Sequence, residues 1–147
     1  MKRALSFLIF ALSPLLALAA DPGVTANAPV TNFKLPILND AGYRSSLLRG
    51  SEARYISASQ IDLIGMQYTT FIGDGTNELD STLLAPTATV FFDHNKVKVH
   101  GEDSVRLIRK NVDVTGERWT YDHDQKRILI EQNVRVVFQI ELHDILK

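Results

Sequence analysis

Apolar and polar residues alternate with a period of two along the second half of the chain. The clearest run is the last, in which Val134, Val136, Phe138, Ile140 and Leu142 share one parity, with mostly polar residues on the other. This period predicts a β-strand with one face against a core and the other in water. A slip of the register by a single position would turn all of these apolar side chains outward, so the register is strongly specified.

Shorter segments of the same kind, separated by polar turns, fill most of the remaining chain after residue 30. We expect roughly ten strands of about 5 to 10 residues. No window after residue 20 has a convincing helical period, although 142–147 could end as a short turn. The pattern therefore predicts an all-β antiparallel sandwich, jelly roll or barrel in which neighbouring strands pair as meanders. The expected strands include 30–38, 43–48, 53–58, 60–64, 67–72, 83–92, 96–100 and 134–142.

A short motif occurs twice in the second half of the chain. Phe92-Asp93-His94-Asn95 and Tyr121-Asp122-His123-Asp124 each join an aromatic strand end to a polar turn and a returning apolar strand. Such self-similarity is typical of a unit that is copied and stacked to bury its apolar face. The spacing to the next strand differs between the copies, so the repeat is degenerate.

The N-terminal segment, 1–20, has the features of a secretory signal peptide. Lys2 and Arg3 precede an apolar run over 4–18, and the small residues Ala19 and Ala20 follow it. The alternative is a retained membrane anchor, but Pro14 interrupts the run, which is shorter than the roughly 20 residues that span a bilayer. We expect 1–20 to be removed, 21–29 to be a flexible lead and 30–147 to form a single domain.

Composition excludes some classes of protein. The chain has 147 residues and is 45% hydrophobic, an ordinary globular balance. Without Lys2 and Arg3 it has 14 basic against 17 acidic residues, a formal charge of −3. The basic residues are spread singly along strands, so no nucleic-acid partner is expected. There is no cysteine, which rules out disulfides.

Few residues suggest catalysis or metal binding. Asp93-His94 and Asp122-His123 would suit a general base or a metal ligand, but at turns Asp is also favoured for local hydrogen bonds, and we prefer that interpretation. Trp119 and a neighbouring Tyr could form a glycan-binding platform, although aromatic residues at strand spacing on an apolar face are more often core. The sequence thus predicts no catalytic residue, metal or cofactor, and an apolar interior without ionisable groups.

A set of strand and turn motifs resembles one family, the LptC and LptA (OstA-like) proteins of periplasmic lipopolysaccharide export. The resemblance runs from about Val30 to Phe138, and its motifs are soft strand patterns. They are 33–38, Asn39-Asp40-Ala41-Gly42, Ala53-Arg54-Tyr55, 116–122, Ile128 and Asn133-Val134-Arg135-Val136.

The resemblance implies a twisted antiparallel β-jelly-roll that is open at both ends and acts without catalysis in the periplasm of a Gram-negative bacterium. Lipid A acyl chains of lipopolysaccharide would slide along an inner apolar groove, because burial of each CH₂ stabilises them by about 0.8 kcal/mol. Edge strands would pair with other jelly-roll modules of the export bridge, and an inner-membrane transporter is a further implied partner. A cleavable signal departs from LptC, which keeps its anchor; the hairpin over 33–48 favours the LptC type over the LptA type.

The residues expected to bind the lipid share the apolar parity of successive strands, and 133–142 is expected to offer a docking edge. The alternatives are a β-sandwich interaction scaffold with a filled core and no lipid ligand, and a hydrolase that uses Asp122 and His123. The expected groove residues are Val97, Val99, Val105, Leu107, Val112, Val114, Trp119, Tyr121, Ile128, Ile130, Val134, Val136 and Phe138.

Overall fold

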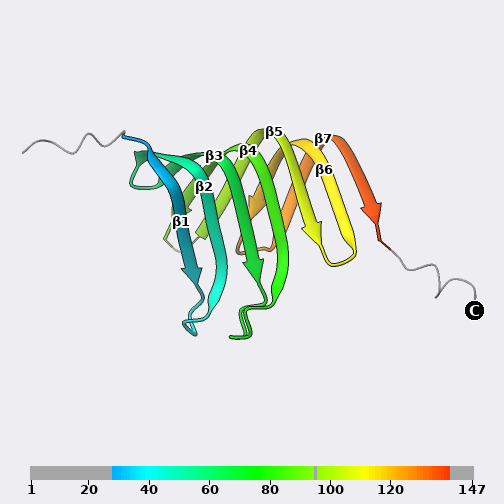
Figure 1. Ribbon diagram of the computed structural model, residues 1–147, viewed down its shortest axis with the longest axis horizontal. Helices are drawn as coiled ribbons and strands as arrows, with labels where there is room; N and C mark the ends of the chain where they lie inside the picture. The colour runs from blue at the N-terminus through cyan, green and yellow to red at the C-terminus, as the bar shows by residue number, and fades with distance from the viewer. Residues whose placement is uncertain (1–27, 95, 140–147) are drawn as a thin grey trace, which may run out of the picture.

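A computed structural model describes residues 28–94 and 96–139 and contains seven strands (Figure 1). The predicted all-β class is confirmed. The predicted number of strands is wrong, because the strands are fewer and longer, with 9 to 15 residues each. The signal peptide, residues 21–27 of the lead and the turn at 142–147 lie outside the described residues. The strands are β1 (Val30–Leu38), β2 (Arg44–Ser57), β3 (Gln60–Phe71), β4 (Leu79–Asp93), β5 (Lys96–Arg109), β6 (Val112–Asp122) and β7 (Arg127–Phe138).

All seven strands belong to one antiparallel sheet, in the order β1 to β7. Each strand pairs with its neighbours in the chain, which confirms the predicted meander. β1 and β7 are the two edges of the sheet and lie at opposite ends of its long axis (Figure 1). The two copies of the repeated motif lie where β4 leads to β5 and where β6 leads to β7, but the connections differ in length, because β5 begins at Lys96 soon after Asp93 and β7 begins at Arg127, further from Asp122.

The strands bend near their middles instead of ending there. In β3, Leu63 and Met66 are both buried although their odd spacing would put the two side chains on opposite faces of a regular strand. Gly65 between them has a φ of 61°, and Arg118 occupies the corresponding place in β6 with a φ of 51°. Such bulges bend a strand and let its ladder resume beyond. The two short strands expected over 60–64 and 67–72 are therefore one.

The line of bends divides the sheet into two layers that face each other. Tyr68 of β3 lies across from Tyr121 of β6, with ring centroids 5.4 Å apart, and Phe33 of β1 lies 6.2 Å from Tyr55 of β2. A single folded sheet thus encloses one core. Layer I consists of residues 30–31, 52–57, 60–64, 87–93, 96–101, 117–122 and 127–132; layer II consists of 33–38, 44–50, 66–71, 79–85, 104–109, 112–116 and 134–138.

The core is tightly packed in the middle strands. Trp119 is 1% exposed, and its ring lies over Gly101 of the neighbouring strand. A Cβ atom on Gly101 would come within 2.4 Å of the Trp119 Nε1 atom, so only glycine fits there. The structure places Trp119 and Tyr121 in this core, in agreement with the preferred interpretation of these aromatic residues.

Candidate functional site

All the predicted groove residues lie on the inner faces of the layers. The register pairs Leu107 with Val114 and Val114 with Val136, so these three form one cross-strand row. Residues directly opposite one another in an antiparallel ladder share a face. The alternating pattern therefore identified the inner face correctly in β5, β6 and β7.

Exposure of these residues rises from the middle of the sheet towards β7. Because the predicted groove residues near the middle of the sheet are packed inside the core, the interior is not a continuous trough. Only the half-buried and the exposed groove residues are accessible to a ligand. The buried residues are Val97, Val99, Val105, Trp119 and Tyr121; the half-buried ones are Leu107, Val112, Val114, Ile128 and Ile130; the exposed ones are Val134, Val136 and Phe138.

The two layers are offset, which explains this gradient. Tyr68 of β3 in layer II already faces β6 of layer I, so few strands of layer I remain to cover the later strands of layer II. As a result, Val136 is 46% exposed and Phe138 is 64% exposed, although both are on the inner side. We call this uncovered surface the open face; it comprises Val112, Val114, Val134, Val136 and Phe138.

The two edges of the sheet differ in what they offer to a further strand. Among the described residues, β7 pairs only with β6, and β1 pairs only with β2. Pro36 lies within β1 and has no N–H to give to an added strand, whereas β7 contains no proline. The predicted docking edge coincides with β7 over 133–138, and its residues 140–142 lie outside the described part.

His123 and Tyr68 form a buried polar contact between the layers. The Tyr68 Oη atom lies 2.8 Å from His123 Nδ1 and donates a hydrogen bond to Ser46 Oγ at 3.0 Å. Among the described residues this is the one side-chain hydrogen bond that joins layer II to the turn between the layer I parts of β6 and β7. Burial, and then the charge of Lys126, lowers the pKa of His123, so the imidazole is neutral at pH 7.

The expectation of an interior without ionisable groups is therefore wrong. His123 is only 9% exposed, although its turn otherwise has the predicted chemistry, with Gln125 N donating to Asp122 Oδ1 at 3.1 Å. Arg109 also lies on the inner side, in the row of Ser81 and Val112. Charged groups fit there because the row lies beside the solvent-exposed ends of the layers, where Arg109 pairs with Asp80 at 3.4 Å.

A cavity of about 870 Å³ lies between the ends of the two layers, beside His123. Its apolar walls come from both layers, with Ile37 and Phe71 on one side and Phe92 and Val97 on the other. Its rim carries charges of both signs. We call this cavity the mouth.

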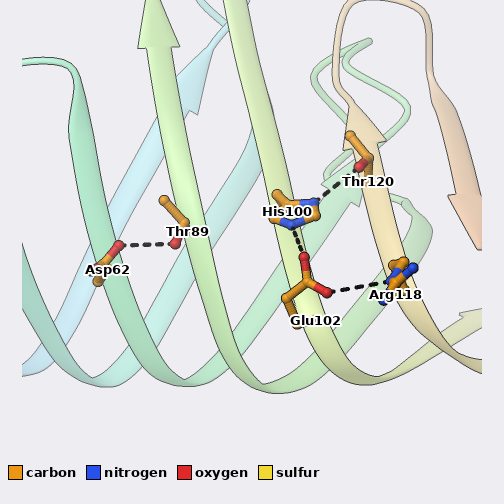
Figure 2. Close-up of polar contacts among 6 residues, drawn as sticks. All are labelled: Asp62, Thr89, His100, Glu102, Arg118 and Thr120. Atoms are coloured by element: carbon orange, nitrogen blue, oxygen red, sulfur yellow. Dashed lines mark hydrogen bonds and ion pairs between the residues drawn. The ribbon is translucent and has the colours of Figure 1, made fainter.

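A set of polar contacts lies on the outer face of layer I (Figure 2). Asp62 accepts a hydrogen bond from Thr89 at 2.9 Å, and His100 contacts both Thr120 at 3.2 Å and Glu102 at 2.8 Å. Arg118 lies 3.4 Å from the same Glu102. These contacts join β3 to β4 and β5 to β6 across the solvent side, where the exposed apolar side chains of Ile64, Phe91 and Leu129 also lie.

The Asp-His pairs are not brought together into a catalytic arrangement. Asp93 contacts His94 in an exposed turn, whereas His123 bonds to Tyr68 and Asp122 bonds within its own turn. Residues 28–94 and 96–139 hold no cluster of three or more His, Asp or Glu side chains suited to a metal ion.

No protein-family model matches the chain, and no curated protein matches it either. In the described part of the chain, no helix is long and apolar enough to cross a membrane.

Proposed function

We propose that this protein is a non-enzymatic periplasmic module for lipopolysaccharide transport, with an OstA-like β-jelly-roll of the LptC type. The open face would shield acyl chains of lipid A from water, and the β7 edge would pair with a neighbouring jelly-roll module. The inner-membrane export transporter is the further partner that this role implies.

One observation carries this proposal: an apolar inner surface remains uncovered next to an edge strand. Val134, Val136 and Phe138 are exposed side by side on the inner face of β7, and Val112 and Val114 continue that surface on β6. Exposed apolar surface of this kind marks binding sites for lipids or proteins. Each buried CH₂ would contribute about 0.8 kcal/mol, so burial on this surface would stabilise a bound acyl chain while leaving its binding reversible.

Two neighbouring residues of β7 allow a matched test. Val136 is on the inner face, and Val137, which is 40% exposed, is on the outer face. A photo-crosslinking amino acid at each position in living cells should capture lipopolysaccharide at Val136 and not at Val137. Equal capture at both positions, or none at Val136, would contradict the proposal.

The filled middle of the core favours a second candidate, a β-sandwich scaffold that binds only proteins. Leu48, Tyr68 and Leu83 are fully buried, so the interior there has no room for a ligand. Such a scaffold would use the β7 edge alone. Crosslinking at Val136 to protein, with no lipid adduct, would support it.

A further inference from the structure

The mouth is continuous with the hydrophobic core. Val97 belongs to the core, and Ile37 and Phe92 pack against it. The polar side chains at its rim are of both signs, with Lys96 and Lys126 opposing acidic residues, so no net charge favours an ionic group inside it. An uncharged apolar segment therefore suits the mouth better than a headgroup does.

The Tyr68–His123 hydrogen bond lies where the mouth meets the core. His123 lines the mouth, and Tyr68 is fully buried behind it. Aromatic contacts reinforce the bond, because the Tyr68 ring lies 5.9 Å from the imidazole in an edge-to-face arrangement. A chain moving inward from the mouth has to part these two side chains.

The line of bends, which lies away from the mouth, can act as the hinge for such a movement. The ladder between β4 and β5 is interrupted at the bend, between the Leu84–Arg106 pair and the Thr89–His100 pair. Fewer backbone hydrogen bonds resist deformation at this point than elsewhere in those strands.

We propose that an alkyl chain of an amphiphile enters the interior through the mouth, and that the Tyr68–His123 hydrogen bond is a clasp that has to open before the chain passes between the layers. This inference rests on the proposed function, because it assumes that an acyl chain is the ligand. It adds a route into the interior that is separate from the solvent-exposed open face, and the contact that controls this route.

Uptake of a dansylated undecanoic acid by the purified protein, followed by stopped-flow fluorescence, tests the clasp. Tyr68→Phe removes the buried hydroxyl and keeps the ring; of the two hydrogen bonds lost, the one to His123 spans the mouth and the one to Ser46 lies within layer II. Loss of one such hydrogen bond corresponds to about a tenfold change in an opening equilibrium, so uptake should be about tenfold faster. The matched control is Tyr55→Phe, since Tyr55 also contacts the opposite layer but makes no side-chain hydrogen bond to another described residue. Its uptake rate should equal that of the wild type.

A second variant breaks the clasp from the other side. His123→Leu should also speed uptake, and combining it with Tyr68→Phe should add nothing further, because both remove the Tyr68–His123 bond and the Ser46 bond lost with Tyr68→Phe lies within layer II. Uptake by the wild type at the same rate as by both variants would overturn the clasp and leave the proposed function standing. No uptake by any of the proteins would overturn both, whereas uptake by the variants alone would support the clasp.

Discussion

Gly101→Ala should strongly destabilise the protein, because the fold depends on Trp119 lying directly over this position. An added Cβ would come within 2.4 Å of Nε1, 2.6 Å of Cε2 and 2.8 Å of Cζ2 of the indole. Favourable contacts between carbon atoms lie at about 3.5 to 4.0 Å, so the overlap is roughly 1 Å with several ring atoms. Trp119 is almost fully buried and cannot swing aside without moving the opposite layer.

Overpacking of this size costs about 3 kcal/mol, the upper end of the usual range for added core methyl groups. Urea unfolding followed by circular dichroism should show a midpoint lower by about 1 to 3 M for a typical slope. Ser104→Ala, at an exposed position of the same strand, should change the free energy of unfolding by less than about 0.5 kcal/mol. Trp119→Phe in the Gly101→Ala background should recover part of the loss, because the smaller side chain lacks the indole atoms that clash with the added Cβ. A Gly101→Ala protein as stable as the wild type would refute the packing described for the core.

Two further predictions test the buried histidine and the gradient of burial. The pKa of His123 is lowered in the folded protein from its ordinary value near 6.5, so the unfolded chain takes up the proton first and the free energy of unfolding should fall as the pH drops below about 6.5. Urea titrations at pH 7 and pH 5 should show this loss in the wild type and a smaller one in His123→Leu; equal pH dependence in both proteins would contradict it. Leu83→Ala should cost about 3 kcal/mol because Leu83 is fully buried, whereas Phe138→Ala should cost less than about 1 kcal/mol because Phe138 is largely exposed. Similar losses in the two variants, measured by urea unfolding, would show that the inner face near β7 is covered in solution.

The side-chain pattern predicted the faces of the sheet better than it predicted the strands. Alternation assigned Val114, Val136 and Phe138 to the inner face because this period is a local property of an extended backbone. Gly65 looked like a break between strands, since glycine is typical of loops. In the folded chain it adopts a positive φ that bends the strand while the ladder continues on both sides.

The candidate site was only partly predictable, because it depends on how far the two layers are offset. Val99 and Val136 have the same local pattern, yet one is buried and the other is exposed. The difference arises from non-local packing of β3 against β6, which no short window of sequence reveals. His123 was assigned to a polar turn for the same reason: its neighbours indicate a turn, and only the position of Tyr68 shows that the imidazole points inward.

The central claim is that the inner face of β6 and β7 is open to an acyl chain. Methyl NMR of the purified protein with a fatty acid that carries a nitroxide at the end of its chain tests this claim most directly. We expect the signals of Val112, Val114 and Val136 to broaden on addition of the fatty acid, while that of Val137, on the outer face of the same strand, stays sharp. Equal broadening of Val136 and Val137, or no broadening at Val112 and Val114, would contradict the claim.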